Sequence, residues 1–271
     1  MPALTDTLTM TNGVEITRIG LGTWQIPDGP VTYDSVAAAL AAGYRHIDTA
    51  RAYQNEESVA RAITDSGLAR SEVFVTTKLP AEAKSYDRAM GSFNKSMRLL
   101  GMDYVDLYLI HAPWPWADRG TDCTEGNAEA WRALEDIYES GRARSIGVSN
   151  FEVSHLEALA KTARITPHVN QIQFYVGCNQ PETTTYCKSA GIVVEAYSPL
   201  ATGKILDDPD LKVMADKYGK TVAQLAIAYT LAKGTVTLPK STTPRRIVEN
   251  TDVDFAIDPD DLQVLDNLTT V

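Results

Sequence analysis

An aspartate and a tyrosine five positions apart, in the stretch 47–56, could together carry out proton transfer. Asp48 ends a short apolar run, and Tyr53 comes just before an Asn-Glu pair typical of a helix start. A phenol with an ordinary pKa of about 10 is a poor acid at neutral pH unless its surroundings change it. Alone the pair is a weak signal, because such an aspartate is often a helix N-cap and such a tyrosine a surface aromatic.

Two further ionisable residues, Lys78 and His111, each close an apolar run farther along the chain. An ammonium stabilises a phenolate, so we expect Lys78 to lower the pKa of Tyr53 while Asp48 keeps the lysine charged. Tyr53 would then be the general acid, and His111 would orient or polarise a carbonyl oxygen. The alternatives are a solvated lysine at a strand terminus and a histidine with a structural role.

Eight short apolar runs must position these residues, and they alternate with helical patterns. The runs are nearly continuous, as expected for strands buried on both faces. A glycine follows most helical stretches and precedes a strand, where a left-handed helix C-terminus is common. This order predicts an α/β fold, the (β/α)8 TIM barrel. The runs are 19–22, 45–48, 73–78, 105–111, 145–149, 169–173, 192–197 and 235–238, and the glycines are Gly43, Gly67, Gly101, Gly141, Gly191 and Gly234.

Two further patterns refine this fold. Asn12-Gly13 between short alternating runs predicts an N-terminal β-hairpin with a type I′ turn, which would close the bottom of the barrel. The rival fold is doubly wound and needs Gly-x-Gly-x-x-Gly after its first strand, but Gly20-Leu21-Gly22 is followed by Thr23-Trp24-Gln25. No change in composition marks a boundary, so residues 1–271 are expected to form a single domain.

In such a barrel the catalytic groups lie at the C-terminal ends of the strands. Nearly every apolar run here contains or precedes polar residues near its end, and we expect these to converge on one rim. Lys240 with Arg245-Arg246 is the only tight basic cluster after residue 200, and it suits a phosphate monoester. The polar residues are Asp48, Lys78, His111, Ser149, Asn150, Asn170, Gln171, Gln173, Tyr197, Ser198, Lys240 and Ser241.

The composition indicates the partners and the compartment. A net charge of −10 argues against nucleic acid and anionic membranes, because both bind basic surfaces. Cys123, Cys178 and Cys187 lack metal-ligand spacing, so we expect free thiols and no metal site. The sequence shows no signal-peptide pattern and no apolar run of about 20 residues. We expect a cytoplasmic monomer whose partner is a small-molecule carbonyl substrate.

The ordered motifs resemble the aldo-keto reductase superfamily over essentially the whole chain, and within it the bacterial, diketogluconate-reductase-like members. The resemblance implies an NADP(H)-dependent oxidoreductase that reduces aldehydes and ketones, including small sugar-type or dicarbonyl compounds. It also implies a catalytic tetrad of Asp48, Tyr53, Lys78 and His111. The matching stretches are 20–24, 48–50 with Tyr53 and 55–56, Lys78, 100–101, 106–108 with His111, Gly141, 146–151, 170–171, 197–200, 239–241, Arg246 and 249–250.

The resemblance further implies where the cofactor binds. Ser149, Asn150 and Gln171 would hold the nicotinamide carboxamide, and Tyr197 would stack on the ring. The other implied cofactor-binding residues lie in three groups along the chain. They are Gly22 and Thr23 after the first strand, Ser198, Leu200 and Gly203 along the pyrophosphate, and Lys240, Ser241, Thr242 and Arg246 around the 2′-phosphate with Glu249 and Asn250 near adenine.

Three departures from the family pattern bear on the substrate. Ala112 follows His111 where many relatives have tryptophan, the sixth run continues Gln171-Ile172-Gln173, and the sequence ends at Val271 where longer relatives carry a loop. We expect an open substrate pocket walled by Trp24, Trp114 and Trp116, although each of the last two could instead pack beneath its loop.

Two alternative functions remain open on the same fold. One is a non-catalytic NADP(H)-binding regulatory subunit. The other is a Schiff-base lyase that uses Lys78 as the nucleophile.

Overall fold

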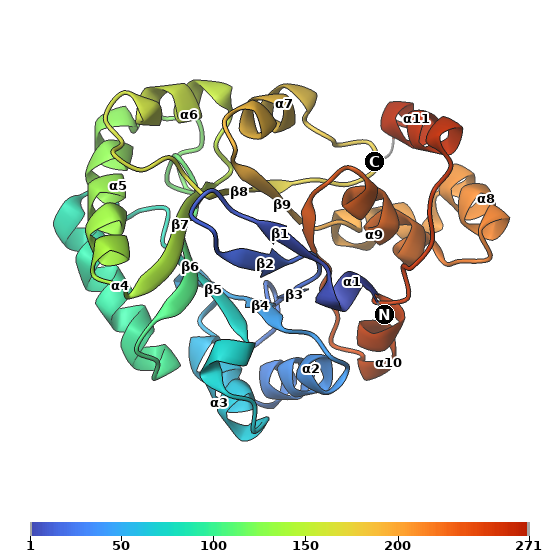
Figure 1. Ribbon diagram of the computed structural model, residues 1–271, viewed down its shortest axis with the longest axis horizontal. Coiled ribbons are helices and arrows are strands. Elements are labelled where there is room, and N and C mark those ends of the chain that lie inside the picture. Colours follow the sequence, from blue (N-terminus) through green and yellow to red (C-terminus); the bar gives the residue numbers. More distant parts are fainter. Residues whose placement is uncertain (1, 270–271) are drawn as a thin grey trace.

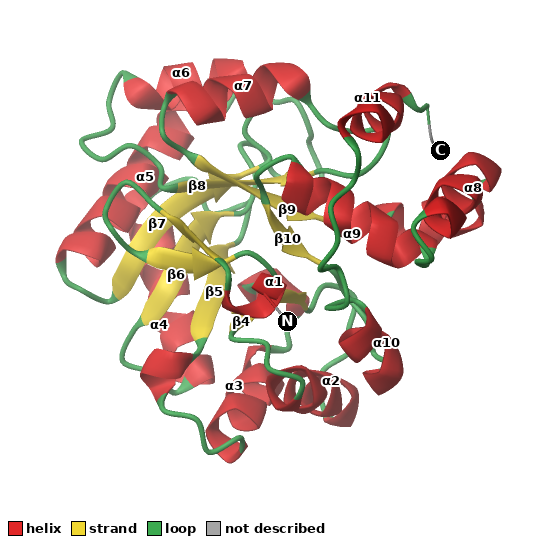
Figure 2. Cartoon of the chain, turned by 45° about the vertical axis from the view of Figure 1, so that its right-hand side comes forward, coloured by secondary structure: helices red, strands yellow, loops and turns green. Residues whose placement is uncertain are grey.

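The computed structural model describes residues 2–269. An eight-stranded parallel sheet forms its centre, surrounded by helices (Figure 2). The strands are hydrogen-bonded in the order β10-β9-β8-β7-β6-β5-β4-β3, so each neighbours the next along the chain. The predicted (β/α)8 barrel is confirmed, and the strand limits shift by only one or two residues. The strands are β3 Leu21–Gly22, β4 His46–Asp48, β5 Phe74–Leu79, β6 Val105–Ile110, β7 Ala143–Ser149, β8 Val169–Gln173, β9 Val193–Tyr197 and β10 Val236–Leu238.

The first and last strands meet and close the ring. A parallel bridge joins Ile19 to Thr237, and the Gly20 amide donates to the Thr237 carbonyl oxygen at 2.9 Å. Gly20 is required at this junction, since a Cβ there would lie 2.7 Å from Nδ1 of His46. The expected run 19–22 is therefore regular strand only over its second half, and its first half makes the closing contact.

Helices follow the strands and cover the outside of the barrel (Figures 1 and 2). The six glycines expected at helix ends all have positive φ, between 60° and 100°, as the left-handed position requires. The helices are α1 Pro2–Thr5, α2 Pro30–Ala41, α3 Glu56–Asp65, α4 Tyr86–Leu100, α5 Thr124–Glu139, α6 Val153–Ala160, α7 Pro181–Ser189, α8 Pro209–Lys217, α9 Val222–Ala232, α10 Pro244–Glu249 and α11 Pro259–Asn267, with short 3-10 segments η1 Arg51–Tyr53, η2 Arg70–Glu72 and η3 Ala201–Asp207.

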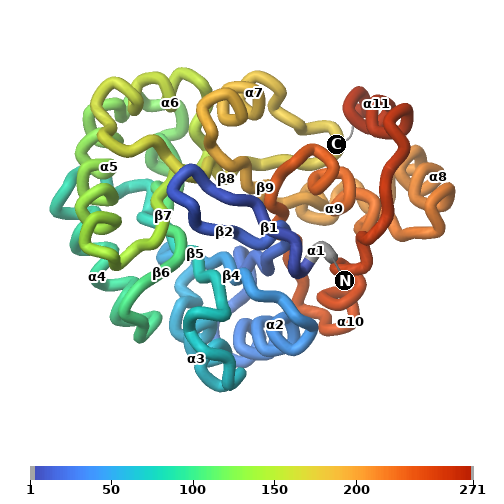
Figure 3. The backbone as a smooth tube through the Cα atoms, viewed as in Figure 1, coloured from blue at the N-terminus to red at the C-terminus, as the bar shows by residue number. Residues whose placement is uncertain are grey.

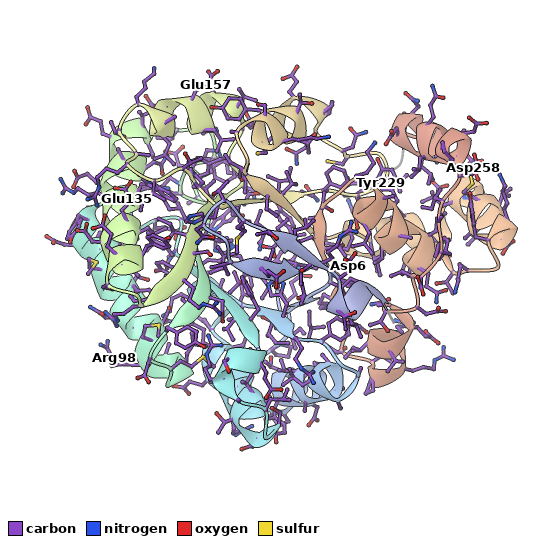
Figure 4. The ribbon with its side chains drawn as sticks, in the orientation of Figure 1. Asp6, Arg98, Glu135, Glu157, Tyr229 and Asp258 are labelled. Carbon is purple, nitrogen blue, oxygen red and sulfur yellow. The ribbon has the colours of Figure 1, made fainter. Side chains whose placement is uncertain are left out.

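Hydrogen bonds between segments far apart in the sequence stabilise the outer layer of helices. Helices α2 and α10 lie side by side at the closure of the ring (Figure 3), where the buried Tyr44 hydroxyl donates to the Ile247 carbonyl oxygen at 3.0 Å. On the opposite side, the buried carboxylate of Glu135 on α5, labelled in Figure 4, accepts from the backbone amides of Arg164 at 2.6 Å and Ile165 at 2.9 Å. These bonds satisfy backbone groups in a loop that no strand pairs.

The N-terminal hairpin lies across one end of the barrel (Figure 1), as predicted. Strand β1 Thr7–Thr9 pairs antiparallel with β2 Glu15–Thr17. Met10 and Ile16 pack with Leu107, Leu109 and other buried residues of the barrel strands. The hairpin therefore supplies apolar side chains that fill this end of the barrel core.

The predicted type I′ turn is wrong. Type I′ needs positive φ at both central residues, whereas here only Gly13 has one, at 81°. The Gly13 amide closes the turn on the Met10 carbonyl oxygen at 2.9 Å. Asn12 instead uses its side chain to donate to the Arg144 carbonyl oxygen at 2.9 Å and to Ser145 Oγ at 3.1 Å, at the start of β7. These two bonds hold the Asn12 side chain, and with it the turn, against β7.

No helix among residues 2–269 has both the length and the apolar character needed to cross a membrane.

Candidate active site

Four side chains that the sequence placed at strand ends, or just beyond, meet at the C-terminal rim of the barrel. The fully buried Lys78 on β5 donates from Nζ to both carboxylate oxygens of Asp48 on β4, at 2.7 Å each, and to the Thr49 carbonyl oxygen at 2.9 Å. Its Nζ also lies 3.4 Å from the Tyr53 hydroxyl. The alternatives of a solvated lysine and a capping aspartate are therefore wrong.

Tyr53 also faces His111. Its hydroxyl lies 3.5 Å from Nε2 of His111, and the two rings meet edge to face with centroids 5.5 Å apart. The Tyr53 phenol thus contacts both a cation and an imidazole, which is the arrangement a proton donor to a bound oxygen requires.

A buried amide holds the loop that carries Tyr53. The Asn55 side chain donates to the carbonyl oxygens of Thr23 and Ile26 at 3.1 and 3.0 Å, and its own oxygen accepts from Thr49 Oγ1 at 2.8 Å. Asn55 therefore ties the segment after β4 to the segment after β3. Its position in the sequence indicated only a helix start, so this positioning role was missed.

Burial sets the protonation states of His111 and Tyr53. Desolvation, with a further contribution from the Lys78 charge, lowers the pKa of His111 to about 3, so this imidazole is neutral at physiological pH. Burial, followed by the negative charges of Asp48 and Glu195, raises the pKa of Tyr53 well above its ordinary value. The expectation of a lowered pKa for Tyr53 is wrong, because burial, the largest cause, and the charges of the two acids favour the protonated phenol.

The residues expected around the nicotinamide also lie together. Ser149 Oγ donates to the Gln171 carbonyl oxygen at 2.8 Å, and the Asn150 amide nitrogen donates to the His111 carbonyl oxygen at 2.9 Å. The Tyr197 hydroxyl donates to Asn150 Oδ1 at 2.8 Å. Asn150 has a φ of 62°, a left-handed backbone that asparagine tolerates better than most residues.

Two buried ionisable residues of the barrel interior were missed in the sequence. Glu195 lies in the middle of β9 and His46 at the start of β4, and both are fully buried. Glu195 accepts from Nε2 of Gln171 at 2.6 Å, and the same nitrogen donates to Oδ2 of Asp48 at 2.8 Å. The signal was present, since a glutamate interrupts an otherwise apolar strand, where unpaired charges are rarely buried.

The three tryptophans expected around the substrate differ in their surroundings. Trp114 and Trp116 contact each other at 5.2 Å between ring centroids, and Trp116 meets His111 at 5.4 Å. Trp24 is 45% exposed. The guanidinium of Arg119 lies over both loop tryptophans, 5.5 Å from the Trp114 ring and 5.1 Å from the Trp116 ring.

The segments expected to hold the rest of the cofactor follow β9 and β10. Lys240, Thr242 and Arg246 are exposed, whereas Ser241 is buried and accepts from the Thr243 amide at 3.1 Å. Glu249 pairs with Arg245 at 3.3 Å. Gly203 lies in η3 with a φ of 93°, and its amide donates to the Leu200 carbonyl oxygen at 2.7 Å.

Backbone contacts occupy the two residues expected near the cofactor after β3. The Gly22 amide donates to the Pro239 carbonyl oxygen at 3.2 Å. Thr23 is fully buried, and its hydroxyl donates to the Asp48 carbonyl oxygen at 2.9 Å. Within residues 2–269, no group of three or more histidine, cysteine, aspartate or glutamate side chains could hold a metal ion.

The fold and this site define a TIM-barrel enzyme built around a buried lysine–aspartate pair. The sequence pattern of the Aldo/keto reductase family matches residues 18–269. A glyoxal reductase of Bacillus subtilis is 45% identical over 267 residues, which cover 98% of this chain and 94% of that protein. The chain therefore belongs to the aldo/keto reductase family.

Solved structures agree with this assignment. An aldo/keto reductase from Brucella melitensis has a TM-score of 0.90 at 42% identity, covering 96% of this chain and 98% of that one. A Bombyx mori aldo-keto reductase in complex with NADP has a TM-score of 0.87 at 34% identity, covering 96% and 92%. The protein is an NADP(H)-dependent oxidoreductase of this family.

Proposed function

We propose that the protein reduces the carbonyl group of small aldehydes and ketones, including dicarbonyl and sugar-type compounds, with Tyr53 as the general acid. One observation carries the proposal. The Tyr53 hydroxyl lies within 3.4 Å of the Lys78 ammonium and 3.5 Å of His111 Nε2, beside the closed Asp48–Lys78 pair.

The protonation states suit reduction. Bound NADPH supplies the hydride that reaches the carbonyl carbon. His111, neutral because burial lowers its pKa to about 3, can present an N–H group to the carbonyl oxygen. The raised pKa of Tyr53 keeps its phenol protonated, and an alkoxide is basic enough to take that proton. Lys78 stabilises the phenolate that remains.

The chain offers matching groups for the cofactor. Ser149, Asn150 and Gln171 lie on the rim beside His111 and provide hydroxyl and amide groups for a carboxamide, and Tyr197 offers a ring for stacking. Lys240 and Arg246 are exposed cations that form no ion pair with another residue in the range 2–269, so they fit a phosphate monoester. The exposed cations support NADPH over NADH, because only NADPH carries the 2′-phosphate.

The remaining predicted cofactor contacts complete this proposal. They lie at the end of β3, after β9 and β10, and at the end of α10. They are Gly22, Thr23, Ser198, Leu200, Gly203, Ser241, Thr242, Glu249 and Asn250.

The substrate would bind near the loop tryptophans. Trp114 and Trp116 extend the aromatic surface that begins at His111, and Trp24 is exposed after β3. The Bacillus subtilis relative is named a glyoxal reductase, which supports a small dicarbonyl compound as the first substrate to test.

A nucleotide titration tests the cofactor assignment. Quenching of tryptophan fluorescence should show tight binding of NADPH and weaker binding of NADH. Arg246→Gln should weaken NADPH binding about tenfold and leave NADH binding unchanged, since a charged hydrogen bond contributes roughly 1.5–3 kcal/mol. Arg132→Gln is the matched control, because Arg132 is an exposed cation on α5 that pairs with Glu129. Absence of binding by either nucleotide would overturn the proposal.

A second variant tests whether Tyr53 is the general acid. Tyr53→Phe should remove most turnover on a carbonyl panel while leaving NADPH affinity nearly intact, because only the proton donor is lost. A variant with wild-type turnover would show that another group supplies the proton.

The structure favours neither alternative function. Lys78 is an ammonium held by two carboxylate contacts of 2.7 Å, so it is a poor nucleophile for a Schiff base. Borohydride trapping with substrate alone would reveal such a lyase. A regulatory subunit would bind NADPH without turnover on a broad carbonyl panel. The cytoplasmic location, the monomeric state and the single domain stay predictions.

A further inference from the structure

The Gln171 side chain is held by two buried acids on opposite sides. Its amide nitrogen donates one hydrogen to Asp48 Oδ2 at 2.8 Å and the other to Glu195 Oε2 at 2.6 Å. An amide nitrogen carries two hydrogens, so both are used. The amide oxygen is then the part of the side chain left to accept a hydrogen bond from a ligand.

His46 lies behind Glu195 in the barrel interior. Its Nε2 is 3.6 Å from Glu195 Oε1 and 3.1 Å from the Thr76 hydroxyl. The missing side chain of Gly20 leaves room for this ring. His46, Glu195 and Gln171 therefore form a continuous polar row from the barrel interior to Asp48 in the tetrad.

Glu195 and His46, the two ionisable residues of this row, are both uncharged at neutral pH. Asp48 and His46 face Glu195 from β4, Lys78 from β5 and Gln171 from β8. Burial and the Asp48 charge raise the pKa of Glu195 to about 8, against the lowering effects of Gln171 and Lys78. Glu195 therefore carries a proton at neutral pH. Burial, together with the Lys78 charge, lowers the pKa of His46 to about 3, so this imidazole is neutral.

We propose that Glu195 is a positioning residue that fixes the Gln171 amide with its oxygen toward the nicotinamide carboxamide and, while protonated, keeps a second negative charge away from the tetrad. This inference rests on the proposed function. Without the Glu195 acceptor, one hydrogen of the Gln171 nitrogen loses its partner and the amide can turn over.

Loss of the Glu195 proton should limit turnover at alkaline pH. When Glu195 loses its proton near pH 8, a second anion joins Asp48 beside one ammonium. The Glu195 charge is one of the causes that raise the pKa of Tyr53, so its appearance makes the phenol a weaker acid. Turnover should therefore decline above about pH 8, before Tyr53 itself ionises.

Two substitutions separate the positioning role of Glu195 from its charge role. Glu195→Gln keeps an oxygen that accepts from Gln171 but has no charge at any pH. Glu195→Leu removes the acceptor at similar volume. Glu56→Gln is the control, because Glu56 is also a buried carboxyl with a raised pKa, but it bonds to Thr77 on the other side of Lys78. Each variant is measured for NADPH affinity and for kcat between pH 6 and 10.

The expected results differ between variants. Glu195→Gln should bind NADPH like the wild type and lose the decline in kcat near pH 8. Glu195→Leu should bind NADPH about tenfold more weakly, with a smaller effect on kcat at saturation, because an unpaired buried donor costs roughly 1–3 kcal/mol. Glu56→Gln should keep both the affinity and the decline.

Two outcomes would overturn the inference. If the kcat of Glu195→Gln declines near pH 8 as it does in the wild type, the charge role is refuted. If Glu195→Leu binds NADPH as tightly as the wild type does, the positioning role is refuted. Failure of the wild type to bind NADPH refutes the proposed function instead. If Glu195→Leu does not fold, NADPH affinity in Glu195→Ala decides the positioning role.

A separate observation concerns the substrate and also rests on the proposed function. The exposed guanidinium of Arg119 stacks over Trp114 and Trp116, and Trp116 contacts His111. The Arg119 charge also reaches Tyr197 at the end of β9, where it counteracts the effect of burial on the pKa of that phenol. No carboxylate among residues 2–269 forms an ion pair with Arg119.

The geometry points to carbonyl substrates that carry an anionic group, such as a carboxylate, which Arg119 would bind while the carbonyl oxygen faces Tyr53 and His111. In a chain of net charge −10, a free cation over Trp116, which contacts His111, is the local attraction such a substrate needs. The tryptophan faces hold the guanidinium in place by cation–π contact.

Paired substrates test this assignment. In Arg119→Gln, kcat/KM for 4-carboxybenzaldehyde should fall about tenfold relative to that for benzaldehyde, as expected for loss of a charged hydrogen bond. Arg132→Gln is the matched control, because Arg132 stacks on Tyr86 at 5.1 Å on α4. An equal change for both aldehydes, or no change, would overturn the assignment.

Discussion

Lys78 depends on Asp48 more than on any other residue of the site. Its ammonium has three hydrogens, and three oxygens lie within 2.9 Å of it, two from Asp48 and one from Thr49. A charge buried this completely is tolerated only when it is paired and hydrogen-bonded. The Tyr53 hydroxyl, at 3.4 Å, is a weaker fourth contact, so it is the one a substrate can most easily alter.

Removing the ammonium should therefore cost stability as well as turnover. Lys78→Met should lower the free energy of unfolding by about 3–5 kcal/mol, because Asp48 is left as an unpaired buried charge. The double variant Lys78→Met with Asp48→Asn should recover part of that loss while remaining inactive. Urea unfolding of the two single variants and the double variant measures this coupling. Additive losses would show that the pair does not act as a unit.

The hairpin β1–β2 acts at the scale of the element, at the end of the barrel away from the tetrad. It contributes Met10 and Ile16 to the barrel core, and Asn12 ties it to the start of β7. The rim residue Ser149 is at the other end of the same strand. The hairpin should therefore affect folding without affecting catalysis.

Asn12→Ala tests this separation. It removes two hydrogen bonds to β7, so the free energy of unfolding should fall by about 1–2 kcal/mol. The kcat and the NADPH affinity should not change. Thr11→Ala, at the exposed neighbouring position, is the control and should leave stability within about 0.5 kcal/mol. A loss of kcat in Asn12→Ala would place the hairpin in communication with the site.

At the scale of the whole molecule, buried neutral histidines make the fold sensitive to acid. Burial lowers the pKa of both His46 and His111 from 6.5 to about 3. Between these values the unfolded chain binds protons that the folded protein does not. Their contribution to stability is therefore complete above pH 6.5 and is lost as the pH falls toward 3.

His46→Gln should reduce this sensitivity. Between pH 7 and pH 5 the wild type should lose about 2 kcal/mol more of its free energy of unfolding than the variant, since one pKa unit corresponds to about 1.4 kcal/mol. Urea unfolding at the two pH values gives the difference, and any general cost of the substitution cancels. Equal losses in the two proteins would show that His46 is already protonated at pH 5.

Local sequence patterns predicted the strands and helices, because apolar runs and helix-ending glycines act within a few residues of their own position. Continuous apolar runs alternate with helical patterns, most of which end at a glycine. This alternation predicted eight buried strands, and the barrel follows from the order of strands and helices. The residues that end those strands were also readable, which is why Asp48, Lys78 and His111 were found. Asp48 and Lys78 were expected to pair, and the structure confirms that contact.

What the sequence determined by itself was the order of strands and helices, the family and the four residues that meet at the C-terminal rim. Only the tertiary structure decided how burial and charge act on them. The pKa of Tyr53 rises because the fold buries its hydroxyl and brings the carboxyl groups of Asp48 on β4 and Glu195 on β9 close to it. The side-chain amide of Asn12, in the hairpin turn, donates to β7, more than 130 positions away. Both effects depend on distances between residues far apart in the chain, which no local pattern contains.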